Sequence, residues 1–111
     1  MDHVIRYREL IRRILTARAK IPYSHGDLHC KPVFDPDNDS YLLVTQGWDG
    51  KRRVHGIVIH LDIIGGKIWV QRDGTNASIV EELEEAGVPK DHIVLGFRPA
   101  HVRPLTDYAV A

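Results

Sequence analysis

The chain has 111 residues, enough for one hydrophobic core of modest size, and we expect a single domain over residues 1–111. Its 15 basic and 15 acidic residues cancel, so the composition lacks the large basic excess that advertises nucleic-acid binding. The single cysteine, Cys30, excludes an internal disulfide and favours a reducing, intracellular compartment. No apolar run approaches the roughly 20 residues that span a bilayer, and the N-terminus is charged throughout, so we expect a soluble cytoplasmic protein.

The first predicted element is an amphipathic helix from about Asp2 to Ala19. Apolar residues recur there at the spacing of one helix face, and two more widen the stripe. The stripe consists of Val4, Tyr7, Ile11, Ile14 and Leu15, widened by Ile5 and Leu10. Pro22 marks the end, because proline disfavours helical backbone in the residue before it. We expect the stripe to cover a sheet, with the arginines around the opposite face.

Four strands are predicted to follow, joined by connections too short for a crossover. The predicted strands are Leu28–Asp35, Tyr41–Trp48, Arg53–Ile63 and Lys67–Arg72. Asp49-Gly50 indicates a hairpin with a type I′ turn, in which both central residues have positive φ, and Gly65-Gly66 turns the chain again. These short connections predict an antiparallel meander.

The third predicted strand has the clearest alternation of apolar and polar residues. One face carries Ile57, Ile59, Leu61 and Ile63, and the other carries Val58, His60 and Asp62. We expect the first group to be buried beneath the first helix, each residue contributing roughly 1.5–3 kcal/mol before entropy.

A second helix is predicted to begin near Asn76 or Ser78. Ser78 followed by Glu81 makes a capping-box pattern, and Gly87 with Pro89 two residues later is a typical stop. The inner stripe of this helix is predicted to be Ile79, Leu83 and Ala86.

The last predicted elements are a short strand or extended segment at Ile93–Phe97 and a tail that lies extended over the surface. The whole pattern predicts an α+β domain: an antiparallel β-meander packed against an N-terminal helix, with a second helix, a short C-terminal strand and an extended tail. The first helix is basic between Arg6 and Lys20, and the second carries four glutamates. These helices either complement each other or a partner, or simply present two solvated faces, which is the simpler interpretation.

Two groups of side chains invite a metal-binding interpretation. The oxygen donors of Asp35–Asp39 resemble a calcium loop, but Ser40 stands where such a loop needs glycine, which favours a plain turn. Asp37, Asp49 and Lys51 match a nuclease signature in which two carboxylates share a metal and a lysine lies near the attacking water. Both halves of that signature fall in predicted loops, so a metal-dependent nuclease is kept as an alternative only.

His60 and Asp62 share a strand face, which indicates a solvated or hydrogen-bonded pair, because no nucleophile is placed beside them. We predict no catalytic residue, no metal ligand and no cofactor.

A candidate interaction surface is predicted from basic residues near an aromatic turn. Its residues are Arg12, Arg13, Trp48, Lys51, Arg52 and Arg53. A basic triplet beside a tryptophan can grip phosphate and stack a base, and it also protects a sheet margin from aggregation. Direct contact with DNA is therefore a further alternative, and an open sheet edge offers a route to homo-oligomers.

Several segments, in order and at matching spacing over essentially the whole chain, resemble the XisI family. They are Ile21-Pro22-Tyr23, Gly47-Trp48-Asp49-Gly50, His60-Leu61-Asp62, Gly66-Lys67-Ile68-Trp69-Val70-Gln71, Gly87-Val88-Pro89-Lys90 and Ile93-Val94-Leu95-Gly96-Phe97. His92 departs from the acidic residue that the family tends to have before the last of these runs. The resemblance implies one XisI-like domain over residues 1–111.

The resemblance implies a role in DNA recombination, because the family is named for a controlling factor needed to excise the fdxN element in heterocyst-forming cyanobacteria. There the factor accompanies a site-specific recombinase and a companion protein, XisH, usually encoded next door. No catalytic residues are established for the family, so none transfer to this chain. We therefore expect a non-enzymatic factor that binds an XisH-like companion, supports a recombinase complex and does not associate with membranes.

Overall fold

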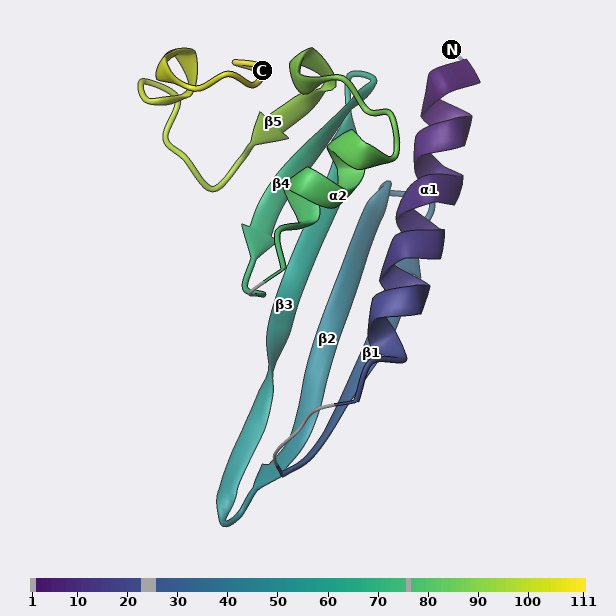
Figure 1. The fold of residues 1–111 in the computed structure, drawn as a ribbon, viewed down its shortest axis with the longest axis vertical. Helices are drawn as coiled ribbons and strands as arrows, with labels where there is room; N and C mark the ends of the chain where they lie inside the picture. The colour runs from purple at the N-terminus through teal and green to yellow at the C-terminus, as the bar shows by residue number, and fades with distance from the viewer. Residues whose placement is uncertain (1, 23–25, 76) are drawn as a thin grey trace.

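The computed structural model describes residues 2–22, 26–75 and 77–111, which form two α-helices and a five-stranded sheet (Figure 1). The elements are α1 (Asp2–Ala19), β1 (Asp27–Asp35), β2 (Ser40–Asp49), β3 (Arg52–Ile64), β4 (Lys67–Asp73), α2 (Ile79–Glu85) and β5 (Ile93–Leu95), with 3₁₀ turns η1 (Lys90–His92) and η2 (Arg103–Leu105). The predicted α+β class and order of elements are confirmed. Tyr23 and Asn76 lie outside the described residues.

The sheet has the order β1-β2-β3-β4-β5, and its first four strands form the predicted antiparallel meander. β5 instead pairs with β4 in parallel, with Ile68 opposite Ile93 and Val70 opposite Leu95. A parallel neighbour needs a crossover, and α2 lies in the connection between β4 and β5.

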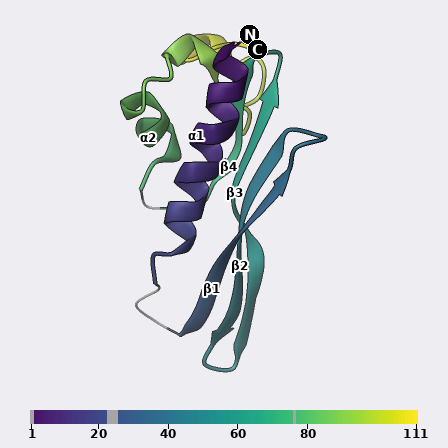
Figure 2. The same cartoon turned by 90° about the vertical axis from the view of Figure 1, so that its right-hand side faces the viewer.

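Both helices lie on the same face of the sheet, and the hydrophobic core fills the space between (Figure 2). α1 contributes Tyr7, Ile11 and Leu15, which are fully buried as the helical spacing predicts. The strand side chains beneath are Tyr41, Leu43, Ile59, Leu61, Ile63, Ile68 and Val70. Ile5 is 56% exposed. The prediction that Ile5 widens the buried stripe is therefore wrong, because this flank of α1 turns away from the sheet.

A β-bulge in β3 changes which of its apolar residues are buried. Leu43 pairs with Ile59 and Val44 pairs with Ile57, so Val58 is an extra residue at the register shift. The alternation reverses there, and Ile57 lies on the opposite face from Ile59. The other three residues of the predicted stripe are buried, but Ile57 is 40% exposed, so its predicted burial is wrong. Val58 packs against the core in its place.

The two tight turns of the meander have different geometries. Asp49 pairs with Arg52, so the loop residues are Gly50 and Lys51, and of these only Gly50 has positive φ, at 63°. Glycine at the first central position is the pattern of a type II′ turn. The predicted type I′ turn centred on Asp49-Gly50 is therefore wrong in its type and is displaced by one residue. The β3–β4 turn has the type I′ pattern, with φ of 60° and 78° at its two glycines.

α2 begins where the capping box predicts. The Ser78 hydroxyl accepts a hydrogen bond from the backbone N–H of Glu81 at 3.2 Å. Two of the three predicted inner residues are buried, but Ala86 is exposed and Val80 is buried in its place. The prediction for Ala86 is wrong because this residue is the C-cap, where the chain leaves the helix.

The C-terminal segment folds back on the sheet, so the predicted extended tail is wrong. The Arg103 guanidinium lies over the Trp69 ring, 4.9 Å from its centroid, and its Nε donates to the Arg98 carbonyl at 3.0 Å. The backbone N–H of Ala109 donates to the Ile93 carbonyl at 2.9 Å. These contacts hold the C-terminal segment against β4 and β5. Its prolines prevent it from forming a longer helix or strand.

The molecule is elongated because the ribbon of β1, β2 and β3 extends beyond both helices (Figure 1). Its extents are 44 × 30 × 25 Å, and its radius of gyration is 14.7 Å, against about 13 Å for a compact domain of this length. β1 is an edge strand that carries Lys31 and Pro32 near its middle. A charge and a residue without a backbone N–H both discourage the addition of another strand.

Candidate interaction surface

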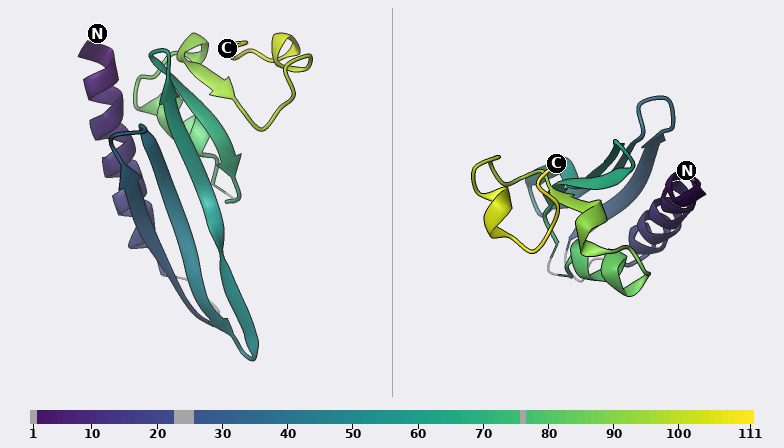
Figure 3. Two further views of the ribbon diagram at one scale, coloured as in Figure 1. Left: turned by 180° about the vertical axis from the view of Figure 1, so that it is seen from behind. Right: turned by 90° about the horizontal axis from the view of Figure 1, so that it is seen from above.

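The sheet has one face that neither helix covers, here termed the open face (Figures 2 and 3). Directly opposed residues of neighbouring strands share a face, so the register identifies its members. Val33 lies opposite Leu42, and Val44 lies between Lys31 of β1 and Ile57 of β3.

An apolar strip occupies the centre of the open face. It consists of Val33, Leu42, Val44 and Ile57, and with His55 and Arg72 it lines a shallow groove of about 700 Å³. Val33 is 39% exposed and Ile57 is 40% exposed. Single exposed apolar residues are ordinary, whereas these four are contiguous and lie in a groove, which makes the strip a candidate contact surface.

Three consecutive cross-strand rows around the apolar strip carry basic side chains and no acidic ones. Their basic and titratable residues are Lys31, Arg72, His29, His55 and His60. Arg72 is held in position because its Nε donates to the Ile57 carbonyl at 2.8 Å. The acidic residues of the open face lie outside these rows, at Asp27, Asp35 and Asp62. The strip is therefore apolar at its centre with Lys31 and Arg72 beside it, and acidic residues lie in the rows beyond.

A polar network borders the apolar strip and includes the predicted histidine–aspartate pair. The Nε2 atom of His60 lies 2.9 Å from Oδ1 of Asp62, which confirms the pair. Ser40 donates to the same oxygen at 2.7 Å, and Gln71 donates to the other at 3.1 Å. The Ser40 proton is thus directed at the carboxylate and away from His60, unlike the serine-to-histidine contact of a hydrolase triad. The network satisfies a partly buried charge.

The turn between β2 and β3 holds four of the six predicted surface residues. The Arg53 guanidinium lies over the Trp48 ring, 5.4 Å from its centroid, and Trp48 is 48% exposed. Arg52 pairs with Asp49 at 3.3 Å, and Lys51 is exposed at the end of the ribbon. The turn is therefore an exposed aromatic and basic projection in which one arginine is already paired.

The structure separates Arg12 and Arg13 from that turn. Arg12 lies over the Phe34 ring, 5.8 Å from its centroid, whereas Trp48 pairs with Asp27 at the other end of β1. Asp27 and Phe34 are seven positions apart along β1, a span of about 23 Å. The six predicted residues therefore form two separate exposed basic groups.

The residues of the nuclease alternative also lie apart. Asp37 is in the β1–β2 turn, whereas Asp49 and Lys51 are at the β2–β3 turn. The ten residues of β2 separate these turns, and a strand of that length spans about 30 Å. One copy of the chain does not bring these three groups to one metal ion.

The predicted turn at residues 35–39 uses its carboxylates for structure. Oδ1 of Asp35 accepts the backbone N–H groups of Asp37 and Asn38 at 3.2 and 3.3 Å. Asp39, with φ of 52°, receives two hydrogen bonds from Arg8 at 2.8 and 2.9 Å. The Arg8 guanidinium, with help from the Tyr41 hydroxyl, holds the pKa of Asp39 below its usual value. This fork ties α1 to the turn.

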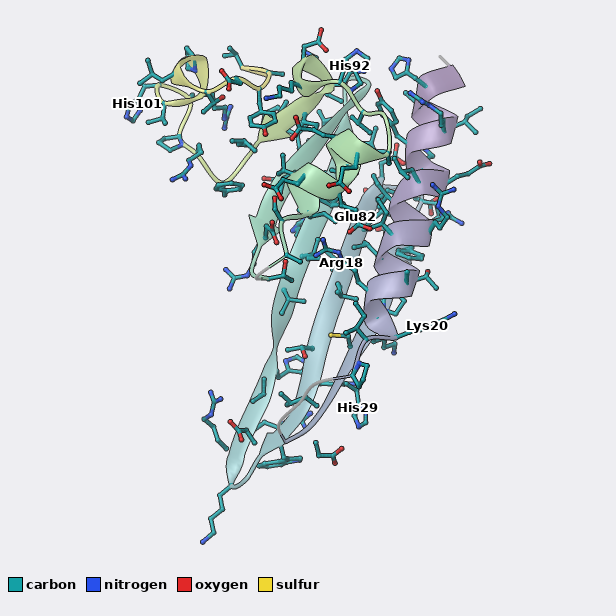
Figure 4. All side chains as sticks on the ribbon, viewed as in Figure 1. Arg18, Lys20, His29, Glu82, His92 and His101 are labelled. Carbon is teal, nitrogen blue, oxygen red and sulfur yellow. The ribbon has the colours of Figure 1, made fainter. Side chains whose placement is uncertain are left out.

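The oppositely charged helices meet at one ion pair. Nε of Arg18 on α1 donates to Glu82 on α2 at 2.8 Å, and Nη1 donates to the Thr75 hydroxyl at 3.1 Å. Figure 4 shows Arg18 and Glu82 pointing toward each other between the helices. The alternative in which the two helices complement each other therefore holds at this pair, while most of the other charges remain exposed.

Within the described ranges, no helix is long and apolar enough to cross a membrane. The same part of the chain holds no group of three or more His, Cys, Asp or Glu residues that could bind a metal ion.

The apolar strip was missed in the sequence because Leu42 and Val44 stand among other apolar residues in β2. A strand with that pattern is predicted to be buried on both faces. The useful signal was the run from Tyr41 to Val44, which places apolar residues on both faces of the second strand, whereas the first helix covers one face only.

The chain matches the family model described as "XisI protein" over residues 1–110. It is similar to the crystal structure of a XisI-like protein from Anabaena variabilis, with 38% identity, a TM-score of 0.89 and coverage of 97% of this chain and 99% of that one. It is also similar to the crystal structure of the fdxN element excision controlling factor XisI from Anabaena variabilis, with 37% identity, a TM-score of 0.81 and coverage of 98% and 99%. A comparison with curated proteins gave no match.

Proposed function

The chain belongs to the XisI family, and from this premise we propose that it is a non-enzymatic controlling factor for excision of a chromosomal DNA element. It acts by binding an XisH-like companion protein and supports a site-specific recombinase in the cytoplasm. The observation that carries the proposal is the likeness, over nearly the full length of both chains, to the fdxN element excision controlling factor XisI.

The open face of the sheet supports a role in binding protein. A strip of four apolar residues lies in a groove on a face that neither helix covers. Of the carboxylates that suggested metal chemistry, Asp35 accepts backbone N–H groups of its own turn, Asp39 binds Arg8 and Asp49 pairs with Arg52. A shallow apolar groove suits contact with another macromolecule, whereas catalytic sites are usually deeper pockets with converging polar groups.

Co-purification tests the proposal. The tagged chain and the XisH-like protein encoded in the same genome are produced together, and the affinity is then measured by isothermal titration calorimetry. We expect a complex at micromolar concentrations or below. If the purified proteins do not associate at that concentration, the companion-binding role is wrong.

Direct DNA binding is a second candidate, favoured by the stacked Trp48 and Arg53 side chains beside exposed Lys51. Phosphate contacts by such residues make affinity fall steeply with salt. Retention on a DNA column that weakens as salt rises, and that Lys51→Ala reduces, would support this candidate. Retention that does not depend on salt would exclude it.

The nuclease alternative has its own test, because it requires Asp49. Any metal-dependent cleavage by the chain should disappear in Asp49→Ala if the alternative holds. Cleavage that persists in this variant comes from another source.

A further inference from the structure

The apolar strip is a contiguous group of partly exposed apolar residues that neither helix covers. Its four residues lie on two neighbouring rows of the central strands, and two of them are about two-fifths exposed. The same sheet packs against α1 on its other face, and the apolar stripe of α1 is buried there. The open face is therefore a partly apolar sheet surface that neither α1 nor α2 covers.

The charges around the apolar strip restrict the chemistry of the occupant. Lys31 and Arg72 flank the strip, His55 lies in the adjoining row, and the three rows hold no acidic side chain. A neighbour that carries acidic residues beside an apolar stripe complements both features. A basic neighbour would meet like charges.

A second copy of this chain fits the apolar strip poorly. Two open faces packed on each other would bring Lys31 and Arg72 of one copy toward the same cationic rows of the other. The acidic helix α2 of a second copy would supply opposite charge, but α2 lies on the covered face. That contact is head-to-tail, and it propagates into an open assembly rather than closing as a dimer.

The β1 edge of the sheet is also a poor route for an occupant. A partner strand would add along β1, where Lys31 and Pro32 discourage pairing. An element that packs on the face through side chains avoids this obstacle, and an amphipathic helix with apolar residues three and four positions apart has the required shape.

We propose that the open face, centred on Val33, Leu42, Val44 and Ile57, binds an amphipathic helix of the companion protein whose apolar stripe is flanked by acidic residues. The inference rests on the proposed function, because it assigns that function's companion to a particular surface. It also names the side-chain chemistry that the companion must present.

Substitutions at Ile57 test the location and the charge together. This side chain is 40% exposed, so a polar replacement is less disruptive there than at a fully buried position. Ile57→Asp removes the apolar contact and places a negative charge opposite the acidic helix, and we expect the affinity for the XisH-like protein to fall at least about 30-fold. Ile57→Lys removes the same contact but adds a favourable charge, so it should bind several-fold more tightly than Ile57→Asp.

The matched control is Ile5, which is 56% exposed on α1 and away from the open face. Ile5→Asp should leave the affinity unchanged. Calorimetric titration of the three variants and the unaltered chain gives the affinities, and circular dichroism verifies that each variant is folded at the assay temperature.

The outcomes separate this inference from the proposed function. If the unaltered chain binds and Ile57→Asp binds equally well, the companion uses another surface and this inference is overturned, while the proposed function stands. If Ile57→Lys binds as weakly as Ile57→Asp, the acidic character of the helix is wrong. If the unaltered chain does not bind at all, the proposed function fails.

Analytical ultracentrifugation tests whether a second copy of the chain occupies the open face. We expect Ile57→Asp to leave the mass of the free chain in solution unchanged. If the unaltered chain is a dimer and Ile57→Asp is a monomer, the face belongs to a second copy and the inference is overturned.

Discussion

Single residues decide how the elements of this protein are tied together, and Asp39 is the clearest case. It has a left-handed backbone conformation with φ of 52°, and it receives both hydrogen bonds of the Arg8 fork and a third from Tyr41. One turn residue thereby connects α1, β2 and the β1–β2 turn.

The lowered pKa of Asp39 predicts a pH-dependent contribution to stability. A carboxyl whose pKa is lower in the folded state stabilises the fold above its unfolded pKa, about 3.9, and loses that contribution as pH falls through the folded value. Asp39→Asn keeps the backbone conformation accessible, so it should lower the Tm by a few degrees at neutral pH. The difference from the unaltered chain should shrink below about pH 4.

Thermal unfolding followed by circular dichroism from neutral pH to about pH 2.5 measures this difference. Asp37→Asn is the matched control, because Asp37 is an exposed carboxyl of the same turn. A constant Tm difference for Asp39→Asn at every pH would contradict the assignment.

Two glycines of the ribbon should respond in opposite ways to the same substitution. A Cβ on Gly47, at φ of 144°, would lie 1.9 Å from the Asp27 carbonyl oxygen. A Cβ on Gly56 would meet nothing within 4 Å. Gly47→Ala should destabilise the fold by at least about 2 kcal/mol, whereas Gly56→Ala should be neutral or stabilise it by up to about 1 kcal/mol.

Urea unfolding of the two glycine variants gives both free energies. Equal stabilities would show that the β1–β2 contact at Gly47 is looser than its position indicates.

At the scale of elements, the bulge in β3 places Ile57 and Ile59 on opposite faces of the sheet, although simple alternation predicts that both are buried on the same face. Ile59 is fully buried and Ile57 is 40% exposed. Ile59→Ala should cost about 2–5 kcal/mol through lost burial and a cavity. Ile57→Ala should cost less than about 1 kcal/mol, mainly through strand propensity and partial burial.

Chemical denaturation compares the two isoleucine variants at equal protein concentration. Similar losses for both would place Ile57 beneath α1, as simple alternation predicts.

The elements differ in how well the sequence could predict them. The bounds of α1 were predicted because helical spacing, a nearby proline and a long apolar stripe agree. Gly56 lies two residues before Val58 and is a bulge signal that the simple alternation overlooked. Val58 itself resembles its neighbours, so the pattern alone did not show which residue is the extra one. The parallel pairing of β5 depends on where the crossover through α2 places three residues, which local pattern does not determine.

The candidate interaction surface was likewise predictable in part. The sequence identified the exposed aromatic and basic turn at Trp48, since its residue types are unusual in a turn. It could not show that Arg12 lies far along β1 from that turn, because distance between elements follows from packing. The apolar strip was hidden because Ile57 changes face at the bulge.

At the scale of the molecule, stability should be uneven along the sheet. The half of β3 that pairs with β4 lies under the helices, with Ile59, Leu61 and Ile63 buried, whereas the half near Arg53 extends past them with little burial. Backbone groups in sparsely packed regions open locally with low free energies.

Hydrogen exchange should therefore be slow in residues 59–63 and orders of magnitude faster in residues 48–54. Mass spectrometry or NMR of the free chain measures both segments in one experiment. If a companion protein covers the open face, exchange in β2 and β3 near Val44 and Ile57 should slow in the complex.

The pair Lys31-Pro32 in β1 has a consequence for crowded solutions. Proline is tolerated in edge strands where its nitrogen faces solvent. A strand from another molecule that aligned with β1 would find no backbone N–H donor at Pro32, and it would meet the ammonium group of Lys31 next to it. Lateral growth of the sheet from molecule to molecule is thereby discouraged. Along β1, contacts with other molecules are then made by interlocking side chains, which can be specific, rather than by shared backbone ladders, which accept almost any sequence.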